Sequence, residues 1–201
     1  MNNQKLALFL GMLCGDGCLP IKHNGEGYRD YAVQFYNTDR KLISLFDSLF
    51  LDLFAVKGRI SCISRENKKD LFLFMKYSKE ISNKIKAMGF PEGIKKDVLH
   101  IPKKIEEGTK KEKISFIRGF LITDGCVRKN RTIIFHSGSK IFLEELSALI
   151  KRVFGIDKQI KAYTQREKYE SYQLNLNKSE SETLLSEMPP WDNGTPAVLS
   201  L

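Results

Sequence analysis

The spacing of apolar residues along this chain switches repeatedly between the helical period and the alternation that is typical of strands. Residues 5–15 form an apolar run ended by glycines, which predicts a helix. Residues 31–35 show the period-two alternation of side chains that predicts a strand. From Leu42 to Leu53 the apolar residues return at helical spacing, after Thr38 or Asp39 as the helix cap. The expected first-half elements are a helix at 5–15, strands near 18–22 and 30–36, a helix ending near 53, strands near 56–63 and 70–76, and a helix at 78–88.

The second half of the chain repeats the first. Residues 9–18 (FLGMLCGDGC) are echoed by residues 117–126 (IRGFLITDGC), with an offset of 108 positions. Downstream the offset is 100, as between Met88 and Met188. The difference predicts about eight extra residues in the first half, in the glycine-containing loop from Ile21 to Asp30. The expected second-half elements are a helix at 111–123, strands near 126–136, a helix at 140–153, strands near 156–176 and a helix at 179–187.

The repeat divides the chain into two similar units. We predict a first half at residues 1–94, a polar linker at 95–110 and a second half at 111–201. The 201 residues, of which 42% are hydrophobic, are enough for a substantial core.

The net charge of +9, from 33 Lys and Arg against 24 Asp and Glu, is spread along the chain. It favours a broad basic surface facing a polyanion, although charge alone fits a protein that merely runs basic equally well. The cysteines Cys14, Cys18, Cys62 and Cys126 lack the second pair or histidines of a zinc site, and we expect them to be reduced. The N-terminal apolar run is short for a signal peptide and recurs inside the chain, so we expect an intracellular protein without signal peptide or membrane span.

Asp16 and Asp124 occupy equivalent places just after the repeated apolar runs. Small residues four positions apart precede each one, a spacing that lets two helices approach closely. A carboxylate at a helix C-terminus is unfavourable, and two neighbouring carboxylates repel each other. A single Asp-Gly pair usually marks only a turn. Two in equivalent places favour a shared divalent cation.

The two motifs resemble those of the LAGLIDADG homing endonucleases, and the order of helices and strands extends the resemblance over nearly the whole chain. The resemblance implies an α+β fold of two pseudo-symmetric αββαββα units, whose antiparallel sheets form a DNA-binding saddle. It implies that Asp16 and Asp124 are catalytic metal ligands, assisted by the backbone carbonyls of Gly15 and Thr123.

The resemblance further implies a monomer that hydrolyses both strands of a long, non-palindromic DNA target with Mg²⁺. Two or three ions are expected near the paired aspartates, with Mn²⁺ able to substitute and Ca²⁺ binding without cleavage. Oxygen ligands suit Mg²⁺, which can activate water and stabilise a leaving oxygen.

The chain departs from the family at one point. Many members carry Gln or Lys at the end of the second strand of each half, where this chain has Asn37 and Ser137, with His136 beside the latter. We interpret these three as candidate water-organising residues. A basic helper would have to come from elsewhere in the chain or be absent.

Alternating polar residues on the predicted strands are candidates for reading bases in the major groove. Basic residues at the loop tips are candidates for phosphate contacts. The DNA-binding candidates are Gln34, Lys57, Arg59, Ser61, Arg65, Arg128, Arg131, Lys161, Gln173 and Asn175.

Two alternatives stay open at this point. An intron maturase on the same scaffold would bind intron RNA, and a non-cleaving relative would bind nucleic acid only. A purely structural protein would leave the basic excess and the paired aspartates unexplained.

Overall fold

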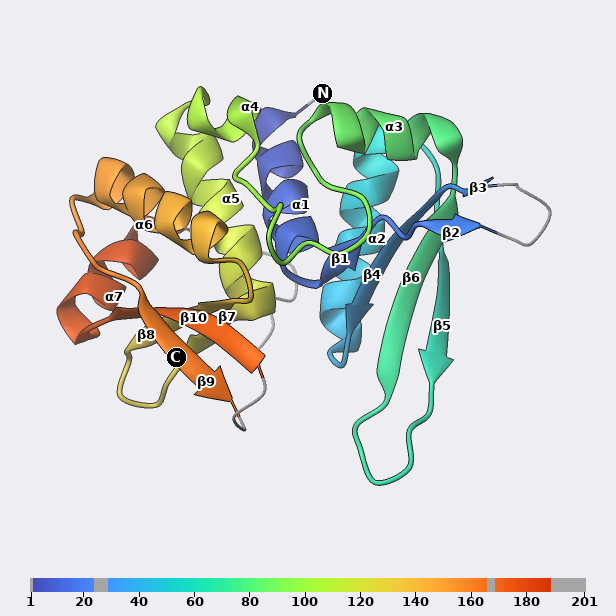
Figure 1. Ribbon diagram of the computed structural model, residues 1–201. Coiled ribbons are helices and arrows are strands. Elements are labelled where there is room, and N and C mark those ends of the chain that lie inside the picture. The colour runs from blue at the N-terminus through green and yellow to red at the C-terminus, as the bar shows by residue number, and fades with distance from the viewer. Residues whose placement is uncertain (1, 24–28, 166–168, 189–201) are drawn as a thin grey trace.

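The computed structural model describes residues 2–23, 29–165 and 169–188 of the chain. Two long helices, α1 (Asn3–Asp16) and α5 (Lys110–Asp124), lie side by side at its centre (Figure 1). Each helix belongs to one half of the molecule. Of the helices in these residues, none is both long enough and apolar enough to cross a bilayer.

The first half builds a four-stranded antiparallel sheet in the order β1-β4-β6-β5. Helix α2 follows β4 along the chain, α3 follows β6, and a small separate hairpin, β2-β3, is inserted before β4. The elements are β1 (Gly17–Cys18), β2 (Lys22–His23), β3 (Arg29–Asp30), β4 (Ala32–Asn37), α2 (Arg40–Phe54), β5 (Arg59–Ile63), β6 (Leu71–Tyr77) and α3 (Lys79–Ala87).

The second half builds the equivalent sheet in the order β7-β8-β10-β9. Its elements are β7 (Gly125–Val127), β8 (Ile133–Ser137), α6 (Lys140–Phe154), β9 (Lys161–Gln165), β10 (Tyr169–Leu176) and α7 (Lys178–Ser186). The predicted α+β fold of two αββαββα units is therefore confirmed.

The extra residues of the first half lie in the inserted hairpin. Cys18 pairs with Gln34, 16 residues later, whereas the equivalent pair Cys126 and Ile134 is separated by eight. The difference equals the shift between the two sequence offsets.

The segment between the halves packs against the rest of the molecule rather than forming a solvated linker. It contains the short helix α4 (Lys103–Glu106), and Leu99, Ile101 and Ile105 are buried in the core. Before α4, the chain descends from α3 to the lower end of α1 and returns (Figure 1).

The two central helices touch backbone to backbone. A Cβ atom added to Gly11 would lie 2.1 Å from the carbonyl oxygen of Phe116, and one added to Gly119 would lie 2.2 Å from that of Leu8. Only glycine fits either position, because the obstacle is backbone that cannot rotate away. The predicted close approach of these helices is present.

Aromatic side chains join each helix layer to its sheet. In the first half the rings of Phe35 and Phe46 stack with centroids 4.2 Å apart, and Phe74 meets Phe46 edge-on at 5.1 Å. In the second half the ring centroid of Phe120 lies 6.2 Å from that of Phe135 and 4.8 Å from that of Phe142. These contacts fix which face of each sheet is covered by helices.

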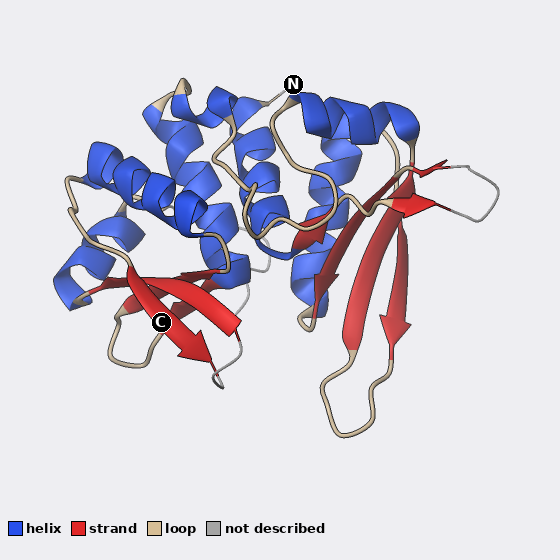
Figure 2. Cartoon of the chain, viewed as in Figure 1, coloured by secondary structure: helices blue, strands red, loops and turns tan. Residues whose placement is uncertain are grey.

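The opposite face of each sheet, which we call the open face, carries no helix layer (Figure 2). Because side chains alternate along a strand, the neighbours of Phe35 and Phe74 point to this face. Cross-strand pairing places Gln34, Met75 and Arg59 on it together.

Candidate active site

Asp16 and Asp124 are the final residues of α1 and α5. The backbone N–H groups of Gly17 and Gly125 still donate to the carbonyls of Leu13 and Leu121, four residues back. The sequence pattern predicts the aspartates just past the last helical turn. In the structure they lie within that turn. Each carboxylate faces the negative end of its own helix.

The helix ends bring the two aspartates together. A Cβ atom on Gly15 would lie 2.0 Å from the hydroxyl oxygen of Thr123 and 3.5 Å from the carboxyl carbon of Asp124. Burial, followed by the charge of Asp16, raises the pKa of Asp124 to about 7. Burial likewise raises the pKa of Asp16, against the opposing effects of Asn37 and Lys95. The pair thus resists carrying two negative charges without a cation nearby.

Lys95, from the loop between α3 and α4, supplies a positive charge at this point. Its ammonium group donates to the backbone carbonyls of Cys14 at 3.0 Å and Gly15 at 2.5 Å. Burial lowers the pKa of Lys95, while the nearby acidic groups, Asp124 and Asp16 among them, raise it. No pattern in the sequence marks Lys95, which lies in a polar stretch far from the strand ends where a basic helper was expected.

The residues expected to organise water differ between the halves. The Asn37 side-chain amide donates to the Asp16 carboxylate at 2.6 Å. Its counterpart Ser137 is buried and accepts from the backbone N–H of Ser139, so it holds the turn before α6. His136 lies on the open face, and burial followed by the charge of Arg128 lowers its pKa.

This donor set fits a hard divalent cation. It consists of two carboxylates and the carbonyls at two helix ends, and the Gly15 carbonyl already accepts a positively charged donor. In the part of the chain that the structure describes, no group of three or more His, Cys, Asp or Glu gathers to form a closed metal cage. Mg²⁺ commonly binds through one or two carboxylates and completes its shell with water and phosphate oxygens.

The open face of the first half carries three of the predicted DNA contacts. Arg59 is exposed and Ser61 is partly exposed, and they pair across strands with Met75 and Leu73. Gln34 is only 7% exposed, and its amide oxygen accepts from Cys18 and Tyr36. Lys57 is exposed just before β5.

The open face of the second half is polar. Gln173 pairs with both His136 and Lys161 across the strands, and Asn175 pairs with Ile134. Lys161 is exposed. The predicted base-reading residues Lys161, Gln173 and Asn175 therefore share this face.

The loop arginines lie in three different settings. Arg65 donates to the carbonyl of Lys69 and closes the turn between β5 and β6. Arg131 donates to Glu182 of α7 at 3.4 Å, and both side chains remain about half exposed. Arg128 is exposed after β7.

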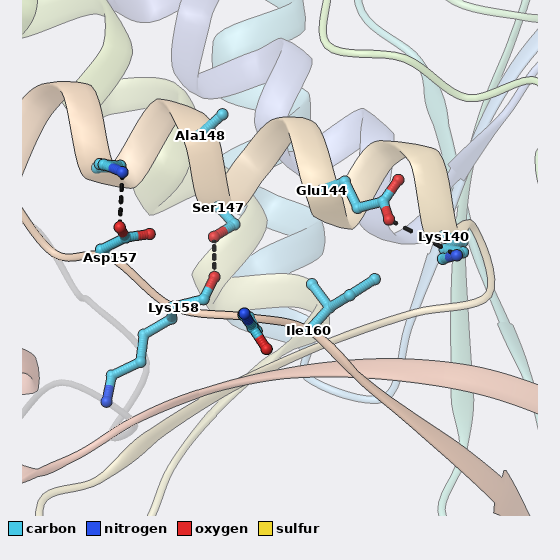
Figure 3. A pocket seen from close by; sticks show the side chains of 9 residues that line it. Lys140, Glu144, Ser147, Ala148, Asp157, Lys158 and Ile160 are labelled. Carbon is cyan, nitrogen blue, oxygen red and sulfur yellow. Dashed lines mark hydrogen bonds and ion pairs between the residues drawn. The ribbon is translucent and has the colours of Figure 1, made fainter.

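A surface groove of about 550 Å³ lies elsewhere, between α6 and the segment leading into β9 (Figure 3). Its charged side chains form ion pairs: Lys151 with Asp157 at 2.6 Å, Lys140 with Glu144 at 3.7 Å, and Lys158 with Glu180 of α7 at 2.9 Å. It shares no residue with the aspartate pair.

The second of the two helix-end motifs falls in a recognised family. The family model for the LAGLIDADG-like domain matches residues 111–188. The second half of the chain is therefore similar to a LAGLIDADG-like domain. The matched segment covers α5 to α7, and the first half repeats the same order of elements.

Solved structures extend the likeness to the whole chain. The homing endonuclease I-DmoI, in a study of its mesophilic variants, superposes with a TM-score of 0.71 at 19% identity, covering 99% of this chain and 97% of that one. I-WcaI bound to its DNA recognition sequence superposes with a TM-score of 0.62 at 14% sequence identity, and the match covers 92% of this chain and 80% of that one. Full-length DUF199/WhiA from Thermatoga maritima superposes with a TM-score of 0.61 at 13% sequence identity, and the match covers 96% of this chain and 57% of that one. The LAGLIDADG-like domain and its partner half thus have the homing endonuclease fold.

A search of curated protein sequences finds no match.

Proposed function

We propose that this protein is a divalent-metal-dependent DNA endonuclease that cuts both strands of a long, non-palindromic site. The observation that carries the proposal is the meeting of Asp16 and Asp124 at the ends of two abutting helices, between two open sheet faces. Burial and the neighbouring charge of Asp16 raise the pKa of Asp124, which calls for a cation at the point where the halves join.

The similar solved structures support DNA and a metal as partners. I-DmoI has been solved with DNA and Ca, and with DNA and Mn, and one of its variants with target DNA in the presence of Mg. We infer Mg²⁺ as the working ion, with Mn²⁺ able to replace it. Because the two open faces differ in sequence, we expect one protein molecule to recognise two unlike half-sites.

In this proposal Asp16, Asp124 and the carbonyls of Gly15 and Thr123 hold the metal ions. When bound, Mg²⁺ supplies an activated water and charge stabilisation at the leaving oxygen. Asn37 orients the Asp16 carboxylate through its 2.6 Å hydrogen bond. Lys95 holds a proton beside the scissile phosphate and offsets the negative charge that develops on it.

The two sheets would position the duplex rather than take part in the chemistry. Arg59 and Lys161 can reach base edges or phosphates from the open faces. Figure 1 shows the two sheets flanking the ends of α1 and α5, so a duplex lying along both would cross the aspartate pair.

The decisive experiment is cleavage of a randomised duplex library with Mg²⁺, followed by sequencing of the cut ends. Asp16→Asn and Asp124→Asn are expected to abolish cleavage of the selected site, and a chelator should do the same to the unchanged protein. Asp157→Asn, which alters an exposed carboxylate paired with Lys151, is the matched control and should cut normally. Cleavage that persists in both aspartate variants would refute the proposed active site.

A role in RNA splicing on this scaffold stays a prediction. Binding of host intron RNA by the purified protein would test it.

A further inference from the structure

The open face of the first half is unexpectedly apolar along β6 and the end of β5. On β6 the residues facing this side are Leu71, Leu73, Met75 and Tyr77, and on β5 Ile63 pairs directly with Leu71. Ile63 is 41% exposed and Tyr77 59%, whereas Leu73 is 9% exposed. Solvated sheet faces are normally polar, so this stripe needs an explanation.

The second half has polar residues at the equivalent places. With the offset of 100, Leu71, Leu73 and Met75 correspond to Ser171, Gln173 and Asn175. The strand pairing agrees, because Leu73 faces Ser61 and Gln173 faces Lys161. Two halves with one fold therefore present different chemistry to whatever lies against them.

The Gln34 side chain beside the stripe is already engaged in hydrogen bonds. The Gln34 amide oxygen accepts from Cys18 at 3.4 Å and from Tyr36 at 2.9 Å, and its amide nitrogen donates to Met75 at 3.4 Å. Beyond Arg59, Ser61 and the hydroxyl of Tyr77 at the end of β6, hydrogen-bond donors directed outward from this face are therefore few. Specific reading of base edges by hydrogen bonds is not what this surface is built for.

One base in the major groove offers an apolar feature. The 5-methyl group of thymine projects into the groove and is contacted by apolar side chains, whereas the other bases offer donors and acceptors there. A leucine, isoleucine or methionine side chain can cover this methyl group and gains from excluding water around it.

We propose that the first half of the protein recognises thymine methyl groups through Ile63, Leu71 and Met75, whereas the second half reads its half-site by hydrogen bonds. This inference rests on the proposed function, since it assumes that the open faces bind duplex DNA. DNA is the occupant because exposed Arg59 shares the stripe's face and Lys57, Lys68 and Lys69 border its ends. An apolar protein partner would not call for that basic margin.

The experiment compares two randomised duplex libraries, one made with thymine and one with uracil, which differs only by the missing methyl group. Protein-bound duplexes are recovered in Ca²⁺ and sequenced, and affinities are then measured for the selected site in both forms. We expect thymine to be enriched in one half-site only. Uracil there should weaken binding about fourfold for each contacted methyl group, and uracil in the other half-site should have little effect.

Variants assign the effect to the stripe. Leu71→Ser and Met75→Asn install the residues of the second half, so both side chains suit this sheet position. They should abolish the difference between thymine and uracil. The matched control Gln173→Ala should weaken binding to both forms equally. Circular dichroism and thermal melting check that each variant is folded.

The outcomes separate the two proposals. Recovery of no DNA from either library would refute the proposed function itself. Tight DNA binding with equal affinity for thymine and uracil would refute only the methyl readout. Self-association of the protein that is lost in Leu71→Ser would assign the stripe to a second copy of the chain instead.

Discussion

The ammonium group of Lys95 lies 2.5 Å from the backbone carbonyl oxygen of Gly15, the residue that precedes Asp16. A residue eighty positions away in sequence thus reaches the end of the central helix. In the metal-free protein it is the positive charge that offsets Asp16 and Asp124.

Replacing Lys95 by Met should slow cleavage of the selected site by at least about 100-fold, because a proton-holding group at the reacting phosphate is lost. DNA affinity in Ca²⁺ should change by less than about tenfold. Lys96→Met is the matched control, since Lys96 is exposed and adjacent in sequence. Equal cleavage rates for the two variants would remove Lys95 from the mechanism.

Asp124 should make the metal-free protein less stable as the pH rises. Its pKa is about 7 in the folded protein against an ordinary value of 3.8. Between these values the folded protein holds a proton that the unfolded chain has released, so the free energy of unfolding falls as pH increases from about 4 to 7. Urea denaturation in a chelator across this range measures the effect.

Asp124→Asn provides the comparison for that titration. It should flatten the pH dependence and raise stability at pH 8 by about 2 kcal/mol, a value reduced because the carboxylate is only partly buried. Added Ca²⁺ should stabilise the unchanged protein and not the variant. A variant with the same pH profile as the unchanged protein would contradict the assigned pKa.

Asn37 and Ser137 occupy equivalent strand ends but should respond differently to mutation. Asn37→Ala removes the hydrogen bond to Asp16 and should weaken Mn²⁺ or Ca²⁺ binding about tenfold, as measured by calorimetry. Ser137→Ala removes an acceptor from the Ser139 backbone N–H and should lower stability by about 1 kcal/mol without altering metal affinity. Matching losses of metal affinity in both variants would overturn this asymmetry.

Gly11→Ala should destabilise the protein by about 3 kcal/mol, because the new methyl group meets the Phe116 carbonyl. Gly138→Ala is the control. Its added Cβ atom would lie 3.6 Å from the nearest atom, in Lys96, so its effect should stay within about 0.5 kcal/mol. Thermal unfolding of both variants tests the difference, and similar melting temperatures would argue against backbone contact between α1 and α5.

The sequence was most informative where a local pattern and a tertiary role coincide. Helix α2 begins after Asp39, whose side chain accepts from the Lys41 backbone N–H, as its capping position predicts. The paired helices could be inferred because small residues four positions apart recur in both halves, as Gly11 and Gly15 and as Gly119 and Thr123. The strand ends were less certain, since β1 is only two residues long and is defined by its pairing with β4.

Features that depend on contacts between residues far apart in the chain could not be predicted from the sequence. Lys95 lies in a polar stretch without periodicity, and only the folded path of the chain brings it to α1. Arg131 stays a predicted phosphate contact, and only the fold shows that it also pairs with Glu182 of α7. The apolar stripe could not be predicted for a similar reason. Leu71 and Phe72 are both apolar, and only the strand pairing shows that they lie on opposite faces of the sheet.

The junction between Gly15 and Thr123 restricts how the two halves could ever be recombined. The space that a side chain would need at Gly15 is filled by the Thr123 hydroxyl and methyl-bearing carbon. A symmetric assembly of two second halves would place threonine against threonine there and collide, while two first halves would leave a gap. Exchange of a half with a related protein should therefore be best tolerated when a glycine on one side meets the larger residue on the other.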